Sequence, residues 1–308
     1  MHEVNYCSDT TYNNEYCGRN TIIIFLWSGY NSIEAQQASP LFTLLALTMS
    51  FIENLFHLAG KVIIITGSTA GLGRELAEAL FQCGASVVVN GRAEDRTVKA
   101  ANEIYEKFGK AEGLLAMHGD MSIMSDVDAL VEKTLQTFGK IDCIINNAGI
   151  NLEEAPFEAH TDTDWERISN TNMRGPINLC RAAIPYLKNS KCGRIINFSS
   201  IGGHVGLPTN VMYTMTKGAI LLFSKSLAAE LATTGICVNS ISPGVMQTRM
   251  NSKFTANDEA GSEVNKLIPM ARMGFPSELV GAVIYLASDA SSYTTGADII
   301  IDGGYTCV

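Results

Sequence analysis

Residues 61–73 read Lys61-Val62-Ile63-Ile64-Ile65-Thr66-Gly67-Ser68-Thr69-Ala70-Gly71-Leu72-Gly73, a β-branched run followed at once by a glycine-rich loop. A continuous apolar run of this kind predicts a strand that is buried on both faces of a sheet. Glycines in the loop allow the backbone to approach a pyrophosphate, and the start of a following helix presents free N–H groups and a positive dipole. The segment therefore predicts a strand–loop–helix unit that binds a nucleotide.

The alternation of apolar runs and helical stretches continues to the end of the chain. Six further strands are predicted at 85–90, 113–118, 141–146, 194–198, 236–241 and 297–301. Helices are predicted at about 71–83, 94–108, 124–138, 164–188, 212–234 and 276–288. Repeated strand–helix units produce a parallel sheet covered by helices on both faces. We predict an α/β fold, a single doubly wound (Rossmann-type) domain with a seven-stranded parallel sheet, over residues 54–308.

Residues 1–53 do not share this pattern, and we predict that they form an N-terminal extension. The apolar runs at 21–27 and 41–52 are shorter than the ~20 residues that a bilayer span needs. The segment also lacks the charge pattern of a secretory or mitochondrial leader. Two alternatives stay open: Met49 is the true start, or residues 21–52 contact a membrane surface, which is the less favoured of the two.

Composition excludes several function classes. The 308 residues carry a net charge of −9, and a nucleic-acid partner would require a basic surface. The eight cysteines are scattered without a C-x-x-C pair, and the five histidines show no ligand spacing. This pattern predicts reduced thiols in a cytoplasmic protein and no metal site.

Two side chains in Tyr213-Thr214-Met215-Thr216-Lys217 have the spacing of an acid–base pair. Positions i and i+4 share a helix face, so the phenol and the ammonium point into the same space. A nearby positive charge favours the ionised form of an acid, which predicts that Lys217 lowers the pKa of Tyr213. Such a tyrosine exchanges a proton with an alcohol or ketone near neutral pH. Ser200, thirteen residues before Tyr213, is a candidate hydrogen-bond donor to the same oxygen.

The residues that end the second predicted strand bear on the choice of cofactor. A carboxylate for the ribose 2′-hydroxyl is expected there, but the sequence is Asn90-Gly91-Arg92. The planar guanidinium of Arg92 suits a 2′-phosphate, which predicts NADP(H) rather than NAD(H). Arg74 and Arg96 either assist Arg92 or are surface charges.

Several motifs together resemble those of the short-chain dehydrogenase/reductase family. Asn146-Asn147-Ala148-Gly149 follows the fourth predicted strand, and Asp302-Gly303-Gly304 follows the last. Pro243-Gly244-Val245-Met246-Gln247-Thr248 resembles the family's nicotinamide loop. The order and spacing of the remaining hallmark residues are similar to the family's catalytic tetrad: Asn172, Ser200, Tyr213 and Lys217.

The resemblance implies a role for each of these residues. Ser200 would polarise the substrate carbonyl, Tyr213 would transfer the proton, Lys217 would lower the tyrosine's pKa and bind the nicotinamide ribose, and Asn172 would anchor a water. Asp120 would bind the adenine amino group. The implied cofactor-binding residues are Thr66, Gly67, Gly71, Leu72, Gly73, Arg92, Asp120, Met121, Asn147, Ala148, Gly149, Tyr213, Lys217, Pro243, Gly244, Val245 and Thr248.

The resemblance further implies an oxidoreductase that moves a hydride between NADP(H) and a ketone or secondary alcohol. The first-choice substrate is a 3-oxoacyl thioester, and the alternatives are a sugar or polyol dehydrogenase and a non-catalytic NADP(H) sensor. We expect the small-molecule substrate to be lined by loops at 150–160, where Asn151, Glu153 and Glu154 lie, at 201–210, where His204 is a candidate contact, and at 249–269. Family members are commonly dimers or tetramers, so a homo-oligomer, in particular a homotetramer, is expected through the helices at 164–188 and 212–234.

Overall fold

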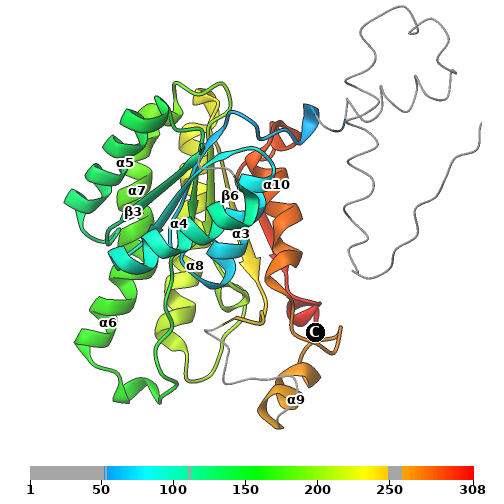
Figure 1. The fold of residues 1–308 in the computed structure, drawn as a ribbon. Coiled ribbons are helices and arrows are strands. Elements are labelled where there is room, and N and C mark those ends of the chain that lie inside the picture. Colours follow the sequence, from blue (N-terminus) through cyan, green and yellow to red (C-terminus); the bar gives the residue numbers. More distant parts are fainter. Residues whose placement is uncertain (1–51, 53, 110–111, 249–258) are drawn as a thin grey trace, which may run out of the picture. The chain divides into compact units, whose positions relative to one another are not determined.

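A parallel sheet of seven strands forms the centre of the chain in the computed structural model, which describes residues 52, 54–109, 112–248 and 259–308 (Figure 1). The strands are β1 (Val62–Ile65), β2 (Ser86–Gly91), β3 (Leu114–His118), β4 (Cys143–Asn146), β5 (Arg194–Phe198), β6 (Cys237–Pro243) and β7 (Asp298–Ile301). Their order in the sheet is β3-β2-β1-β4-β5-β6-β7. The order reverses between β1 and β4, so the predicted doubly wound fold is confirmed.

Helices cover both faces of the sheet, as Figure 1 shows. One face carries α3 (Gly71–Gln82), α4 (Glu94–Phe108) and α10 (Val280–Ala287), and the other carries α5 (Met124–Phe138), α7 (Gly175–Leu187) and α8 (Val211–Leu231). Successive residues of a strand point to opposite faces. Ile63 and Ile65 of β1 therefore pack against the helices on the first of these faces, and Ile64 packs against the helices on the other face. All three side chains are fully buried.

The helix predicted at 164–188 is not continuous. It consists of α6 (Asp162–Ser169), a π-helical turn at Asn170–Arg174, and α7. Single π-helical turns inside helices often mark functional sites, and Asn172 lies in this one. A further helix, α9 (Glu259–Lys266), is present in the segment predicted to cover the substrate.

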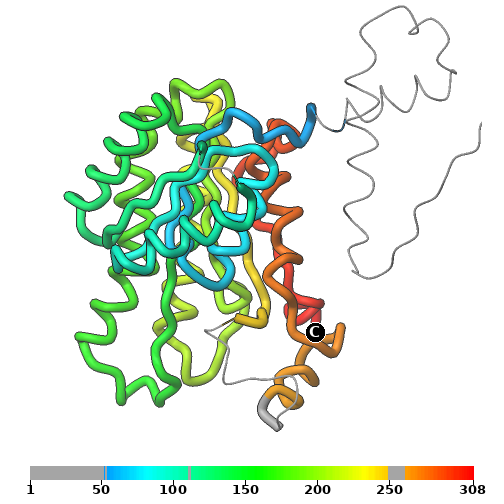
Figure 2. The backbone as a smooth tube through the Cα atoms, viewed as in Figure 1, coloured from blue at the N-terminus to red at the C-terminus, as the bar shows by residue number. Residues whose placement is uncertain are grey.

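Residues from Asn54 to Val308 form one compact unit. Figure 2 shows the blue start of this unit beside the orange end of α10, where Lys61 Nζ pairs with Asp289 Oδ1 at 2.8 Å. The predicted extension at 1–53, with Met49 and both apolar runs, lies outside the described residues except for Ile52. Within the described part of the chain, every helix is too short or too polar to cross a membrane.

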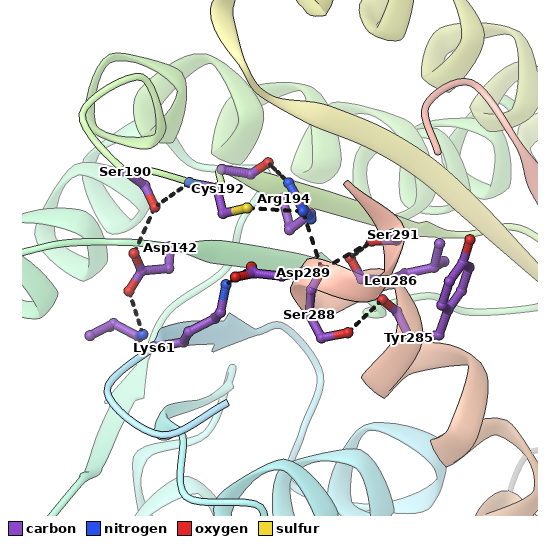
Figure 3. Close-up of polar contacts among 12 residues, drawn as sticks. Lys61, Asp142, Ser190, Cys192, Arg194, Tyr285, Leu286, Ser288, Asp289 and Ser291 are labelled. Carbon is purple, nitrogen blue, oxygen red and sulfur yellow. Dashed lines mark hydrogen bonds and ion pairs between the residues drawn. The ribbon is translucent and has the colours of Figure 1, made fainter. Parts of the chain in front are cut away.

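A buried polar cluster lies at the amino ends of the strands (Figure 3). Arg194, the first residue of β5, is 1% exposed, and its Nη2 donates to Ser288 O at 3.2 Å and to Cys192 Sγ at 3.1 Å. Asp142, before β4, accepts from Ser190 Oγ at 2.7 Å. These residues join loops at the amino ends of the strands. Parallel sheets bind their ligands at the opposite end, beyond the carboxyl ends of the strands.

Candidate active site

The loops at the carboxyl ends of the strands surround a cavity of about 870 Å³. Nearly all of the predicted cofactor-binding and catalytic residues line this cavity. The predicted residues that line it are Gly67, Gly71, Leu72, Gly73, Arg92, Asp120, Met121, Asn147, Ala148, Gly149, Ser200, Tyr213, Lys217, Pro243, Gly244, Val245 and Thr248. Two predicted residues, Thr66 and Asn172, lie behind this wall instead.

The glycine loop packs too closely against its neighbours to accept side chains at two of its glycines. Gly67 has a φ of +65°, and a Cβ there would lie 2.9 Å from Ala148 Cα. A Cβ on Gly73 would lie 2.5 Å from Gly67 O and would also collide with Asn147 Nδ2. The next helix, α3, begins at Gly71 with no side-chain hydrogen bond at its N-cap and no acidic residue in its first turn. Its N-terminal N–H groups are therefore available to an anion in the cavity.

Thr66 holds the loop after β4 against the glycine loop. Its Oγ1 accepts from the backbone N–H groups of Asn147 at 3.1 Å and Ala148 at 3.0 Å, and its carbonyl accepts from Asn147 Nδ2 at 2.9 Å. Thr66 is 2% exposed. It positions the predicted adenosine-side residues and is not part of the cavity wall.

Two arginines lie after β2, Arg92 directly behind the strand and Arg96 in the first turn of α4. Arg92 and Arg96 are both exposed, and both line the cavity. Arg74 is bound elsewhere, because it pairs with Glu78 at 2.6 Å and with Glu103 at 2.8 Å. Of the two arginines considered as helpers of Arg92, the structure thus brings Arg96 to the site and leaves Arg74 outside it.

Asp120 follows β3 in the cavity wall, and one of its carboxylate oxygens accepts hydrogen bonds from within the chain. Its Oδ1 accepts from Ser122 N at 2.9 Å and from Ser122 Oγ at 2.8 Å. These bonds fix the orientation of the carboxylate. The predicted contact of Asp120 with an amino group stays a prediction.

Ser200, Tyr213 and Lys217 meet at the other end of the cavity. Ser200 lies two residues after the end of β5, and a side-chain hydrogen bond joins it to Tyr213 on α8. Lys217 is 5% exposed, lies with Nζ 5.7 Å from the centre of the Tyr213 ring, and donates to Phe198 O at 2.9 Å. The two helical side chains share a face, as their spacing predicts.

Asn172 links the loop after β4 to α8. Its Oδ1 accepts from Ile150 N at 2.9 Å, and its Nδ2 donates to Ile150 O at 2.9 Å and to Thr216 Oγ1 at 3.1 Å. A Cβ on Gly149 would lie 3.5 Å from Asn172 Oδ1 and 3.3 Å from Lys217 Nζ. Asn172 therefore fixes the wall beside Lys217, and its predicted role as a water anchor stays a prediction.

The pKa values of Tyr213 and Lys217 differ from those that their spacing predicts. Burial raises the pKa of Tyr213, and the hydrogen bond with Ser200 lowers it in part. The pKa of Lys217 falls from 10.5 to about 8, because burial disfavours its charge. The predicted lowering of the Tyr213 pKa by Lys217 is not found, since the desolvation of the phenol outweighs other effects on it.

Sequence reasoning missed part of the wall at the substrate end. There, helix α6, the π-helical turn and the loop before α8 add polar side chains whose positions depend on the fold. The additional polar residues are Arg167, Thr171 and Asn210. Asn151 Nδ2 donates to Asn210 Oδ1 at 2.7 Å, and Glu153 and Glu154 lie beside Asn151 in the same wall. His204 is not in the wall, and residues 249–258 of the third predicted loop lie outside the described residues.

Comparison with known proteins agrees with this geometry. Residues 67–306 match a family model described as enoyl-(acyl carrier protein) reductase. The chain is 38% identical over 278 residues to a "Probable NADP-dependent mannitol dehydrogenase" of Yarrowia lipolytica, covering 87% of this chain and 96% of that protein. It is 34% identical over 250 residues to a 3-oxoacyl-[acyl-carrier-protein] reductase of Aquifex aeolicus, covering 80% and 98%.

Solved structures show the same fold. A gluconate 5-dehydrogenase from Burkholderia cenocepacia, in complex with NADP and tartrate, superposes with a TM-score of 0.78 at 32% identity, covering 83% of this chain and 99% of that chain. These matches set aside the alternative of a non-catalytic NADP(H) sensor. The chain belongs to the short-chain dehydrogenase/reductase family and is an oxidoreductase that uses a nicotinamide cofactor to act on alcohol or ketone groups.

Proposed function

We propose that the chain transfers a hydride between NADP(H) and a ketone or secondary alcohol in a small polyhydroxylated substrate, a sugar or polyol. The observation that carries the proposal is one continuous cavity. Its wall holds the glycine loop and Arg92 at one end and Ser200, Tyr213 and Lys217 at the other. The cavity therefore brings a dinucleotide site and a proton donor together.

The residues of the cofactor end fit a phosphorylated dinucleotide. Gly67 and Gly73 let the loop pack closely against Ala148 and Asn147, because a Cβ at either position would collide with these residues, and the first turn of α3 offers N–H groups to a pyrophosphate. Arg92 and Arg96 provide two cations after β2, where a ribose 2′-phosphate would lie. Bound NADPH would supply the hydride for reduction of the carbonyl carbon.

The chain's own residues handle the proton. The raised pKa keeps Tyr213 protonated through neutral pH, so its hydroxyl is available to a carbonyl oxygen. Ser200 Oγ accepts from Gly202 N at 3.1 Å, so the serine proton remains for donation, to Tyr213 in this structure and to a carbonyl oxygen when a substrate is bound. Two donors aimed at the same oxygen stabilise the negative charge that develops during reduction. In the reverse direction, the ammonium of Lys217 favours the phenolate that accepts the alcohol proton.

Polar side chains at the substrate end favour a sugar or polyol over the first-choice 3-oxoacyl thioester. Asn151, Asn210 and Thr171 place uncharged polar groups in the wall, and Glu153 and Glu154 add carboxylates to it. A site that hydrogen-bonds hydroxyl groups discriminates against a substrate that lacks them. The mannitol dehydrogenase and gluconate 5-dehydrogenase relatives support the same substrate class.

The purified chain should be assayed for NADPH oxidation with fructose, a keto-gluconate and acetoacetyl-CoA. We expect a kcat/KM at least roughly 10-fold higher for one of the keto-sugars than for the thioester. We also expect Tyr213→Phe to lose nearly all turnover while retaining NADPH binding. A higher kcat/KM with acetoacetyl-CoA would reject the sugar or polyol in favour of the thioester. Near-normal turnover by Tyr213→Phe would reject the catalytic assignment.

We further propose a cytoplasmic homo-oligomer. The described cysteines are unpaired, and burial raises the pKa of Cys143 and Cys180 to about 12, as expected of inert reduced thiols. On α8, the side chains of Val211, Met215 and Leu222 are exposed on one side of the helix, Leu222 by 68%. An exposed apolar stripe of this kind supports subunit contact through α8.

A further inference from the structure

His204 is the one described histidine with close hydrogen-bond partners on a neighbouring strand, although it does not line the cavity. It follows the 3₁₀ turn at Ile201–Gly203 (η4), which itself follows Ser200. Its Nε2 lies 2.8 Å from Asp298 Oδ2 and 3.1 Å from Ser242 Oγ. The side chains of His204 and Asp298 are 27% and 9% exposed.

The hydrogen bonds around Asp298 determine which nitrogen of His204 carries a proton. Asp298 Oδ1 accepts from Ser240 Oγ at 2.5 Å and from Ser242 Oγ at 3.0 Å. Each serine has one hydroxyl proton, and that proton is used in these bonds. Both partners of His204 Nε2 are therefore acceptors, so Nε2 carries a proton and donates to the carboxylate. This bond persists whether the imidazole is neutral or charged.

The turn that His204 ends is part of the catalytic geometry. Gly203 N donates to Ser200 O at 2.8 Å, and Gly202 N donates to Ser200 Oγ at 3.1 Å. A Cβ on Gly202 would lie 3.4 Å from Tyr213 Cε1, so the turn packs directly against the tyrosine ring. A shift of η4 would therefore move the serine hydroxyl and the tyrosine ring together.

The same carboxylate also holds the strand on the nicotinamide side. Ser242 is the residue before Pro243, Gly244 and Val245, which line the cavity. Asp298 begins β7 and pairs in register with Ser240 of β6. The carboxylate of Asp298 thus binds both the turn behind Ser200 and the strand that leads into the predicted nicotinamide loop.

We propose that His204 and Asp298 are positioning residues that hold η4, and with it Ser200 and Tyr213, at a fixed place relative to the loop after β6. The inference rests on the proposed proton-transfer roles of Ser200 and Tyr213 but not on the substrate class. Small displacements of reacting groups reduce turnover strongly, by up to about 100-fold for 1 Å. The glycine loop and Arg92, the proposed contacts of the pyrophosphate and the 2′-phosphate, lie outside this linkage, so the share of the cofactor affinity that they supply should change little.

The test compares His204→Leu, which removes the donor, with His204→Gln, whose amide N–H₂ takes the place of Nε2–H. The probe reaction is NADPH-dependent reduction of 2,3-butanedione, a small diketone that needs no hydroxyl recognition. We expect His204→Leu to lower kcat roughly 10-fold or more, with the KM for NADPH changed by less than about 2-fold. We expect His204→Gln to recover most of kcat. Asp298→Asn should lower kcat as His204→Leu does.

Asp289→Asn is the matched control, because it removes an aspartate that pairs with Lys61 at the opposite edge of the sheet (Figure 3). It should leave kcat unchanged. Wild-type kcat in His204→Leu, equal losses in the Leu and Gln variants, or a loss confined to the KM for NADPH would overturn the proposal. If His204→Leu does not fold, unchanged kcat in Asp298→Asn overturns it.

Tyr213→Phe in the same assay separates this inference from the proposed function. If that variant is inactive while His204→Leu and Asp298→Asn are fully active, only the positioning role is wrong. If Tyr213→Phe retains wild-type turnover, the proposed proton transfer itself is wrong, and the positioning proposal fails with it.

Discussion

Replacing Lys217 with methionine should remove most turnover and yet leave the folded chain at least as stable at pH 7. The ammonium is buried, and within the described part of the chain its nitrogen has the Phe198 carbonyl as its hydrogen-bond partner and no ion pair. Methionine retains an apolar stem of similar length and removes the charge. The substitution thus separates the electrostatic penalty of burying this group from its contribution to the reaction.

The magnitude follows from the pKa. Burial lowers the pKa of Lys217 from 10.5 to about 8, and each pKa unit corresponds to 1.36 kcal/mol, so the folded chain bears a penalty of about 3 kcal/mol at pH 7. Leaving the Phe198 carbonyl without its donor costs about 1–3 kcal/mol. The free energy of unfolding of Lys217→Met at pH 7 should therefore be equal to that of the wild type or up to about 2 kcal/mol higher.

The pH dependence gives the sharper test. Between pH 8 and 10.5 the unfolded wild-type chain binds a proton at Lys217 that the folded chain has lost, so its stability rises with pH by about 1.4 kcal/mol per pH unit. Below pH 8 the penalty is fully present, and above pH 10.5 it is gone. Lys217→Met has no titrating group at this position, so its stability lacks this pH dependence. Its stability relative to the wild type should fall by about 1.4 kcal/mol per pH unit across this window.

Urea unfolding followed by circular dichroism at pH 7, 8, 9 and 10 measures the difference between the two proteins. Other titrating groups, such as Cys143 and Cys180, are present in both and cancel. Lys225→Met is the matched control on α8, because Lys225 is exposed, and its difference from the wild type should stay flat. A flat difference for Lys217→Met as well would refute the buried-charge reasoning, and retained turnover would refute the need for the ammonium.

Three further perturbations test the cofactor site and the assembly. Arg92→Ala should raise the KM for NADPH about 10-fold or more and the KM for NADH much less; equal effects in steady-state kinetics would contradict 2′-phosphate binding. Gly73→Ala should weaken NADPH binding at least about 10-fold, measured by fluorescence titration, whereas Gly281→Ala, where a Cβ meets no neighbour within 4 Å, should have no effect. Leu222→Glu should lower the oligomeric state in sedimentation velocity, and an unchanged sedimentation coefficient would exclude α8 from the interface.

The fold and the grouping of the candidate catalytic residues could be predicted because their signals are local. Buried parallel strands are continuous apolar runs, so β1 to β7 can be recognised one at a time. The glycine loop lies directly between a strand and a helix. Tyr213 and Lys217 are four residues apart on one helix, and a helix places such residues on one face. Each prediction needed only the geometry of one element and its order in the chain.

The remaining features depend on contacts between distant segments. His204 and Asp298 are 94 positions apart, and neither has a local pattern that indicates a partner. Arg194 begins a strand in the sequence, and only the fold brings it to the carbonyl of Ser288 at the end of α10. Arg74 and Arg96 are equally plausible from the sequence, but Glu78 and Glu103 occupy Arg74. Side-chain pairing across the sheet decides such cases.

The prediction that Lys217 lowers the pKa of Tyr213 was wrong for a physical reason. The same reason bears on the choice of residues around the pair. Spacing predicts that the ammonium is near, but it does not reveal that both groups are desolvated, and desolvation raises the pKa of the phenol and lowers that of the amine. The neighbours that hold the pair are uncharged: Ser200 bonds Tyr213, the Phe198 carbonyl accepts from Lys217, and Asn172 fixes the adjacent wall. A carboxylate beside Lys217 would raise its pKa and neutralise its effect on the phenolate. Uncharged partners leave the pKa of the amine lowered by burial, and in the proposed mechanism its charge acts on the phenol that loses or gains the proton.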